Sequence, residues 1–462
     1  MLKKNFNYFI ILLGFLISTV YSFYIIKNYD RNFINSKKIV SNYIIQGDTE
    51  VYFNEAELLN EQKKIGINFF ERGSDYYVSF LYPRIISNYY SIINKDIKFK
   101  NNIDEEGYFQ VKNGKFFLLI FQSLIYYLSI IFLYRVLIGK LDKRIITFLI
   151  LFLCFEPTIL QFHSHFLTES IYFSFLILLI SLIINLKKNK SYYFFIGILV
   201  GLMYLQRSVA FYLVFPIAIF YFYYAKEKYF YFKILLFIII GQIFILSFVG
   251  FSNYKRSGIF YIVAGQTKHA MWYYLTDQIF SKIKTENNKI LYDRLNDERE
   301  WIEENNINTE KEEDRLLLRN YYQNYFFDKL LKYPLTSIKI ILWKSAQSSI
   351  LDPLMVISSL GQDFSIDKYW EKNLLKMSQR IVYSIIIYFI SIIGFYSFYK
   401  NKNYLIPSIF FILGVYHISL LGWVGVSRYS APSIVCISIF FSNGLVYLHQ
   451  RFKFLKNIKS FL

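Results

Sequence analysis

The sequence predicts an all-α, polytopic membrane protein with about ten transmembrane helices and extracytoplasmic loops that carry amphipathic helices. The first observation is compositional: of 462 residues, 55% are hydrophobic, and they fall in long blocks separated by short charged stretches. The second is length, since most blocks approach the ~20 residues that cross ~30 Å of hydrocarbon. The third is charge, because Lys and Arg cluster in connections that one consistent threading puts on a single side.

The first block, residues 6–26, follows Met1-Leu2-Lys3-Lys4 and is interpreted as a retained signal anchor with its N-terminus inside. No small-residue cleavage site follows it, and it is longer than a typical signal core. Residues 27–115 are polar and cannot lie in lipid, so they are expected to form a first extracytoplasmic loop. Amphipathic stretches at Glu50–Leu59 and Arg84–Ile93 predict helices along the membrane surface.

The later apolar blocks complete the predicted membrane domain. They cover residues 116–138, 145–162, 167–186, 192–206, 208–225, 234–251, 381–399, 404–422 and 431–448. Threaded from an inside N-terminus, they put every short basic connection on the cytoplasmic side, as the positive-inside bias requires. These connections carry Lys140/Lys143/Arg144, Lys187/Lys188/Lys190, Lys226/Lys228/Lys233, Lys400/Lys402 and Arg451/Lys453/Lys456/Lys459.

The same threading predicts which segments face outward and divides the chain into three parts. Residues 1–251 form an N-terminal transmembrane module with the first loop, residues 252–380 a long extracytoplasmic segment, and residues 381–462 the C-terminal spans with a basic cytoplasmic tail. The long segment contains a charged part, Lys284–Arg319, and a half-apolar helix near Leu335–Leu351. That helix is interpreted as interfacial, because Lys339 and Lys344 interrupt its apolar face.

Net charge and cysteine content exclude several classes. The formal charge of +19 comes from clusters beside apolar blocks, a distribution that favours anionic membrane lipids as partners and not nucleic acid. Cys154 and Cys436 both lie in apolar runs, so neither a disulfide framework nor a cysteine metal site is expected.

Two carboxylates lie where a membrane enzyme could use them. Asp48, in the stretch Gln46–Ala56, follows the first span, and Glu169 opens a long apolar helix after Leu167-Thr168. A carboxylate at the mouth of a span keeps its charge only beside water, a cation or a hydrogen-bond donor, so both are functional candidates. The alternative for Glu169 is a first-turn glutamate favoured by the helix dipole.

Cations on the outer side are unusual because the positive-inside bias disfavours them. Arg207 lies at an outer turn, Arg428-Tyr429 at the outer mouth of the last span before Pro432, and Lys268 early in the long outer segment. A guanidinium can bind phosphate through two hydrogen bonds, whereas the simpler interpretation is a snorkelling or solvated surface charge. Together with the carboxylates, these residues suggest one pocket for a phosphate-bearing substrate.

Two histidines precede Glu169 in a short outer loop. His163 and His165 would share a face only if the backbone were extended, and spacing specifies no third ligand. Ordinary polar loop histidines are therefore the simpler interpretation, with His165, Asp48 and Glu169 kept as candidate ligands of a divalent cation.

Several short motifs, in order, resemble those of a known family. They are Asp48 and Tyr52 in Gly-Asp-Thr-x-x-Tyr-x-x-x-Ala, Pro157 before Leu167-Thr168-Glu169-Ser170, Gly197-x-x-x-Gly201-Leu202-x-x-Leu205-x-Arg207, and Arg428-Tyr429-x-x-Pro432. The chain resembles membrane-integral glycosyltransferases of the GT-C class, near the bacterial relatives of protein O-mannosyltransferases and of the lipid A aminoarabinose transferase. The resemblance covers most of residues 1–225 and returns near 420–448.

This resemblance implies an inverting transfer of a sugar from a polyprenyl-phosphate donor to a lipid, glycan or protein acceptor. Asp48 matches the first-loop general base, and Glu169 the second acidic position, which is often Asp in relatives. Arg207 and Arg428 match basic positions near the phosphate, with Tyr52, Tyr429 and Lys268 as further binding residues. Where many relatives have an Arg-Pro-Pro-like stretch, this chain has Leu81-Tyr82-Pro83-Arg84, which makes the match of Arg84 weaker.

The expected location is a bacterial cytoplasmic membrane, with the active site facing the periplasm or exterior. The main alternative is a polymerase or ligase of surface polysaccharide, which also uses polyprenyl-linked sugars but tends to place its arginines in large late loops. A secondary transporter is more distant, because it favours symmetrical halves and mid-membrane charges, and no repeat is visible here.

Overall fold

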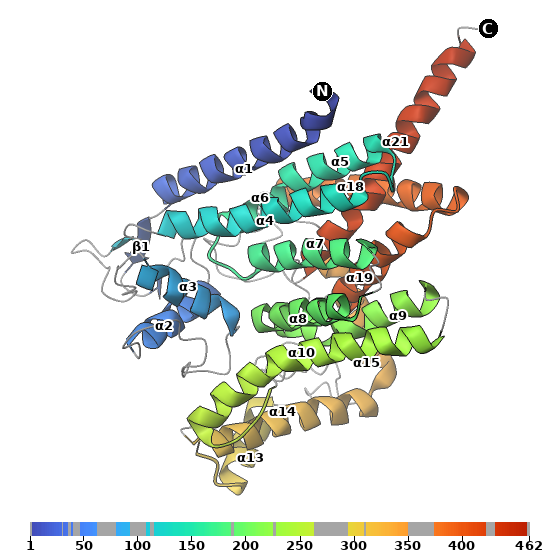
Figure 1. The fold of residues 1–462 in the computed structure, drawn as a ribbon. Helices are drawn as coiled ribbons and strands as arrows, with labels where there is room; N and C mark the ends of the chain where they lie inside the picture. The colour runs from blue at the N-terminus through green and yellow to red at the C-terminus, as the bar shows by residue number, and fades with distance from the viewer. Residues whose placement is uncertain are drawn as a thin grey trace.

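A computed structural model gives the arrangement of most of the chain. It describes residues 2–29, 31–35, 38–39, 47–61, 80–92, 108–110, 115–185, 189–224, 228–262, 294–308, 311–349, 374–421 and 430–459. Within these ranges the protein is a bundle of long apolar helices with shorter helices and strands beside it (Figure 1). The predicted all-α membrane fold is confirmed.

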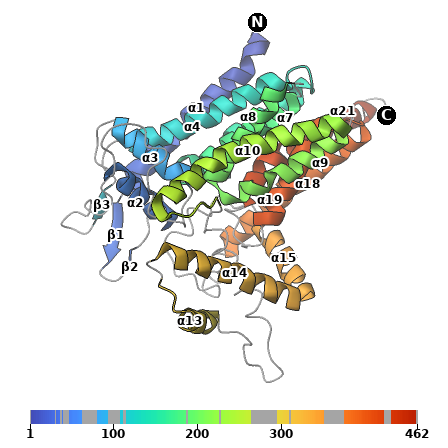
Figure 2. The same cartoon turned by 60° about the horizontal axis from the view of Figure 1, so that its bottom comes forward.

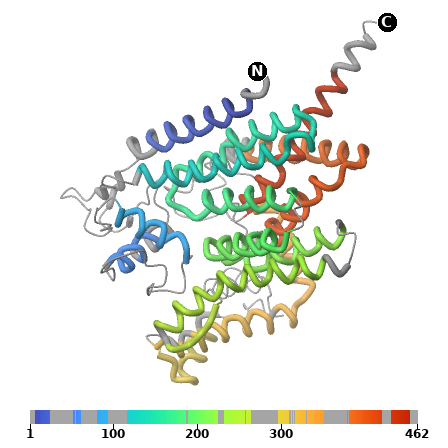
Figure 3. The backbone as a smooth tube through the Cα atoms, in the orientation of Figure 1, coloured from blue at the N-terminus to red at the C-terminus, as the bar shows by residue number. Residues whose placement is uncertain are grey.

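The N-terminal module contains most of the bundle. Its helices are α1 (Leu2–Tyr29), α4 (Lys115–Leu137), α5 (Lys143–Phe155), α6 (Pro157–His163), α7 (Glu169–Asn185), α8 (Lys190–Gln206), the 3-10 helix η1 (Ser208–Leu213), α9 (Val214–Tyr224) and α10 (Lys228–Ser257). Helices α1, α4, α7, α8 and α10 pack successively against one another, so α7 lies in the interior (Figures 1 and 3).

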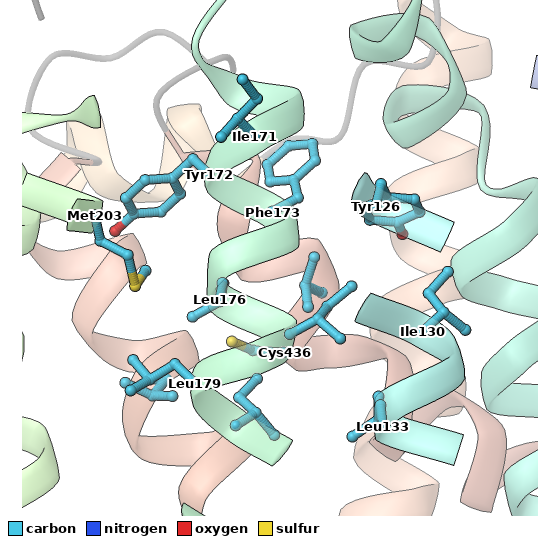
Figure 4. Close-up of a cluster of buried hydrophobic side chains, with 14 of the residues drawn as sticks. Tyr126, Ile130, Leu133, Ile171, Tyr172, Phe173, Leu176, Leu179, Met203 and Cys436 are labelled. Carbon is cyan, nitrogen blue, oxygen red and sulfur yellow. The ribbon is translucent and has the colours of Figure 1, made fainter. Parts of the chain in front are cut away.

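The C-terminal helices close the bundle against this interior helix. They are α18 (Leu374–Lys400), α19 (Leu405–Leu421) and α21 (Pro432–Lys459). Both α19 and α21 contact α7, and α21 also packs on α5 and α18. Figure 4 shows the result: Tyr126, Ile130 and Leu133 of α4, Met203 of α8 and Cys436 of α21 surround α7. Because α7 is enclosed on several sides, most of its residues are buried.

The structure supports the membrane assignment by length and composition. Five described helices are long and apolar enough to cross a bilayer, and α5 and α6 together make a sixth candidate, bent by 47°. Shorter apolar helices cover Glu169–Asn185, Ser208–Tyr223 and Leu405–Ser419. Each lies within or next to an apolar block predicted from the sequence, while the count of ten crossings stays a prediction.

The bend between α5 and α6 has a local cause. Pro157 cannot donate the backbone hydrogen bond that would continue α5, and Glu156 caps the new helix by accepting from the Ile159 amide at 2.8 Å. The other oxygen of Glu156 accepts from the hydroxyl of Tyr383 at 2.9 Å. This buried carboxylate therefore joins the broken span to the C-terminal helix α18.

Two helix pairs approach so closely that only glycine fits. A Cβ added to Gly197 of α8 would overlap the Ile238 carbonyl of α10, and one added to Gly394 of α18 would overlap the Phe440 carbonyl of α21. Small residues at such crossings let apolar helices pack without the hydrophobic driving force that water supplies.

The described part of the first loop contains two helices, α2 (Gly47–Glu61) and α3 (Leu81–Ile92), and three short strands. The strands β1 (Arg31–Asn35), β2 (Lys38–Ile39) and β3 (Tyr108–Gln110) pair antiparallel in the order β2-β1-β3. The helices agree with the amphipathic stretches, whereas the sheet was not predicted. It joins the beginning of the loop to its end.

Residues 252–380, predicted to form the long outer segment, contribute α13 (Arg294–Glu304), α14 (Glu312–Lys332) and α15 (Pro334–Ser348), which lie together on one side of the bundle (Figure 2). Helix α15 is not among the candidate spans, and its interpretation as an interfacial helix stays a prediction. It leaves Leu335, Leu342 and Trp343 exposed.

Candidate functional site

A buried ion pair lies where α7 begins and α8 ends. The guanidinium Nη1 of Arg207 is 2.9 Å from Oε1 of Glu169, and both side chains are buried. Helix α8 stops at Gln206, and Arg207 has an extended backbone (φ −149°, ψ 125°) that leads into η1. Because α7 and α8 are consecutive and packed together, the end of α8 meets the beginning of α7. The structure thus brings together two of the predicted site residues.

The loop before Glu169 is held by a glutamine of α4. The side-chain amide of Gln122 donates to the carbonyls of His163 (3.0 Å) and His165 (2.8 Å), and its oxygen accepts from the hydroxyl of Tyr82 (3.2 Å). Gln122 is fully buried, and these three bonds use both of its amide hydrogens and its carbonyl oxygen. The position of the Glu169 loop therefore depends on a side chain far from it in sequence.

A second amide and a hydroxyl complete this support. Gln206, next to Arg207, donates to the Thr168 carbonyl at 3.1 Å. The hydroxyl of Thr168 donates to Oε2 of Glu169 at 3.3 Å. One carboxylate oxygen of Glu169 thus contacts a guanidinium and the other a hydroxyl, so both oxygens have partners inside the protein.

The first-loop helices lie against this loop through aromatic contacts. The ring of Tyr52 on α2 packs edge-to-face on Tyr82 of α3, with centroids 5.2 Å apart, and Phe53 packs on Phe166 of the Glu169 loop at 5.4 Å. Burial raises the pKa of the Tyr82 phenol well above its ordinary value, and the charges of Tyr52 and Glu169 raise it further. Tyr82 therefore keeps its proton, and its hydroxyl donates a hydrogen bond to the side-chain oxygen of Gln122.

These contacts bear on Asp48, the other predicted carboxylate. Asp48 lies in the first turn of α2, the helix that carries Tyr52 and Phe53, while its side chain lies outside the described residues. Its helix therefore packs on the loop that precedes Glu169. Convergence of the two carboxylates stays a prediction.

The remaining predicted binding residues have different outcomes. Arg84 is buried, with its guanidinium carbon 3.5 Å from the ring centre of Phe80 and its Nη1 donating to the Phe80 carbonyl at 2.9 Å. The predictions for Lys268, Arg428 and Tyr429 concern residues outside the described part of the chain.

The histidines have protein partners. Nδ1 of His165 is 2.5 Å from the Gln161 carbonyl, and Nδ1 of His163 is 2.6 Å from the Ser170 hydroxyl. Among the described residues no three His, Cys, Asp or Glu side chains converge as metal ligands would. A cation held by Asp48, Glu169 and His165 stays a prediction, because the side chain of Asp48 lies outside the described residues.

Three residues of this site were not singled out from the sequence. Gln122, Tyr172 and His417 lie inside apolar blocks, and Figure 4 shows Tyr172 on α7 among the core side chains. A polar residue within a span is itself a functional signal, which applies to Gln122 and His417. Their partners could be found only from the folded arrangement.

The fold and this arrangement define a polytopic α-helical membrane protein, and comparisons with known proteins find similarity to membrane glycosyltransferases. Residues 108–250 match the family model described as dolichyl-phosphate-mannose-protein mannosyltransferase. No sequence among curated proteins matches the chain.

The fold is similar to solved structures of the oligosaccharyltransferase from Archaeoglobus fulgidus. Its complex with an inhibitory peptide and a dolichol-phosphate superposes with a TM-score of 0.52 at 12% identity, over 100% of this chain and 52% of the other. The apo form gives a TM-score of 0.51 at 12% identity, over 99% and 52%. This chain therefore spans about half the length of these structures. The resemblance to GT-C class membrane glycosyltransferases expected from the sequence is confirmed.

Proposed function

We propose that the protein transfers a sugar from a polyprenyl-phosphate donor to a lipid, glycan or protein acceptor at the outer face of a bacterial cytoplasmic membrane. The observation that carries the proposal is the buried Glu169–Arg207 ion pair, which lies beside the loop contacted by the helix of Asp48. The match to a mannosyltransferase family model over residues 108–250 supports a sugar as the transferred group.

In the proposed reaction the acceptor hydroxyl attacks the anomeric carbon and the bond between that carbon and the phosphate oxygen breaks. The hydroxyl proton passes to the carboxylate of Asp48, acting as general base. The polyprenyl phosphate leaves with its negative charge stabilised by Arg207, with Arg428 and Lys268 as further proposed contacts. Attack from the face opposite the phosphate inverts the anomeric configuration.

Glu169 has a defined place in this proposal. An uncompensated guanidinium in a buried site would be costly, and the carboxylate balances its charge until a donor phosphate arrives. The donor phosphate then shares the guanidinium with Glu169, because arginine has five N–H donors. Tyr52 and Arg84 would border the sugar from the first-loop helices.

A divalent cation held by Asp48, Glu169 and His165 remains an additional hypothesis, and no step above uses one. Titrating the purified protein with a chelator and then restoring Mg²⁺ or Mn²⁺ measures its contribution. Transfer that is lost with the chelator and recovered with the metal would support it, and unchanged transfer would remove it.

The experiment that tests the function uses purified protein in lipid nanodiscs with radiolabelled polyprenyl-phosphate sugars and candidate acceptors. Wild type is compared with Asp48→Asn, which keeps the side-chain volume and removes the basic carboxylate. We expect transfer by wild type and at least a ~100-fold loss in the variant, the range of general base catalysis. Full turnover by Asp48→Asn would remove Asp48 from the mechanism. Turnover only with oligosaccharide donors would favour the polymerase or ligase alternative.

A further inference from the structure

A tyrosine and a histidine lie directly behind the Glu169–Arg207 pair. Tyr172 follows Glu169 by one helical turn on α7, so both residues lie on the same side of that helix. The ring centre of Tyr172 is 5.9 Å from the guanidinium carbon of Arg207, within range of a cation–π contact. Tyr172 is fully buried, so its hydroxyl requires a partner inside the protein.

That partner comes from the C-terminal helices. The hydroxyl of Tyr172 is 2.9 Å from Nε2 of His417 on α19, and Nδ1 of His417 is 2.7 Å from the Leu413 carbonyl. A carbonyl only accepts, so Nδ1 carries the proton. In the neutral ring Nε2 is then the acceptor, and the hydroxyl of Tyr172 donates to it. The pair has one defined hydrogen-bond direction.

The residue before His417 reaches the same region. The hydroxyl of Tyr416 donates a hydrogen bond to the carbonyl of Val209. Val209 lies in η1, two residues after Arg207. Tyr416 of α19 therefore contacts the segment that follows Arg207. Its neighbour His417 contacts Tyr172, whose ring lies against the Arg207 guanidinium. His417 is fully buried in a mostly apolar helix, where polar groups are costly unless they are paired, and Tyr172 and the Leu413 carbonyl are its partners.

We propose that Tyr172 and His417 act together as positioning residues for Arg207, keeping its guanidinium directed toward the donor phosphate. The inference rests on the proposed function, since it gives Arg207 a phosphate to bind. Glu169 is Arg207's charge partner on one side and Tyr172 its aromatic support on another. When the phosphate shares the guanidinium with Glu169, the hydrogen bond to His417 prevents the ring from moving away.

The variants are chosen to change one part of this pair at a time. Tyr172→Phe keeps the ring and removes the donor, and His417→Leu removes the acceptor. His417→Gln restores an acceptor that can reach the position of Nε2. The matched control is Tyr192→Phe, which removes a similar bond from a tyrosine hydroxyl to α7, at the Leu182 carbonyl, about 20 Å along the helix from Glu169.

The first readout is binding of farnesyl phosphate, a short polyprenyl phosphate, measured by calorimetry on the full chain in nanodiscs. We expect Tyr172→Phe and His417→Leu each to weaken binding about fivefold, because the ring stays but is no longer held against the guanidinium by its hydrogen bond. The double variant should lose no more than either single one, because the two residues form one unit. His417→Gln and Tyr192→Phe should bind within about twofold of wild type.

A second background separates positioning from a general structural role. In Arg207→Gln, adding Tyr172→Phe should cause no further loss of phosphate binding, because no guanidinium remains to position. An equal loss in both backgrounds, or wild-type affinity in Tyr172→Phe and His417→Leu, would overturn the inference.

A different result would contradict the proposed function: wild type would bind farnesyl phosphate but transfer no sugar from any polyprenyl-phosphate donor. The binding data would still decide the role of the pair. Absence of phosphate binding in wild type would overturn both proposals.

Discussion

Substitution of Gln122 should reduce the free energy of unfolding more than most substitutions in the described membrane domain. Gln122→Leu keeps a similar volume and deletes three buried hydrogen bonds, to the His163 and His165 carbonyls and from the Tyr82 hydroxyl. Interhelical side-chain bonds in membranes contribute ~0.6 kcal/mol on average, so the bonds alone give about 2 kcal/mol. The carbonyls and phenol left without partners add to this, and we expect a total loss of about 3 kcal/mol.

The assay is reversible unfolding in mixed micelles followed by tryptophan fluorescence. The matched control is Gln242→Leu on α10, which removes one bond, from the Gln242 amide to the Phe211 carbonyl at 3.0 Å. The control should lose about a third as much, ~1 kcal/mol. Equal losses for the two variants would refute the reasoning, because Gln122 would then contribute no more than a single ordinary bond.

Further predictions follow from other buried contacts. Glu169→Gln leaves the buried Arg207 without its charge partner and should reduce the free energy of unfolding by about 3 to 5 kcal/mol, measured in the same assay; a loss under ~1 kcal/mol would contradict a buried pair. Gly197→Ala places a Cβ against the α10 backbone and should cost about 1 to 3 kcal/mol, so an unchanged midpoint would contradict the close crossing. Tyr383→Phe removes the hydroxyl that donates to Glu156 and should reduce the free energy of unfolding by about 1 to 3 kcal/mol. Protease cleavage of the connections between spans should also become faster. Cleavage at the wild-type rate would contradict a stabilising bond between Tyr383 and Glu156.

The membrane fold was predictable because its signal is local. Apolar blocks long enough to span a bilayer and basic connections on one side are properties of short segments, and α4, α7, α10 and α18 lie within or next to predicted blocks. The three-stranded sheet was missed because β2 and β3 are too short to show an alternating pattern.

The site was predictable only as single residues. Glu169 and Arg207 were found because a charge at the end of an apolar span requires an explanation. Their pairing, and the bonds from Gln122, Tyr172 and His417, depend on which helices are neighbours, and no periodicity in the sequence determines that. The role of Arg84 stays a prediction, because its contacts with Phe80 do not test a part in substrate binding.

The central claim is that Arg207 binds the donor phosphate while Glu169 balances its charge. An experimental structure of the full chain with a polyprenyl phosphate tests it directly. We expect a phosphate oxygen within ~3 Å of the Arg207 guanidinium, on the side facing α2 and α3. A phosphate bound elsewhere, with the Glu169–Arg207 pair unchanged, would contradict the proposal.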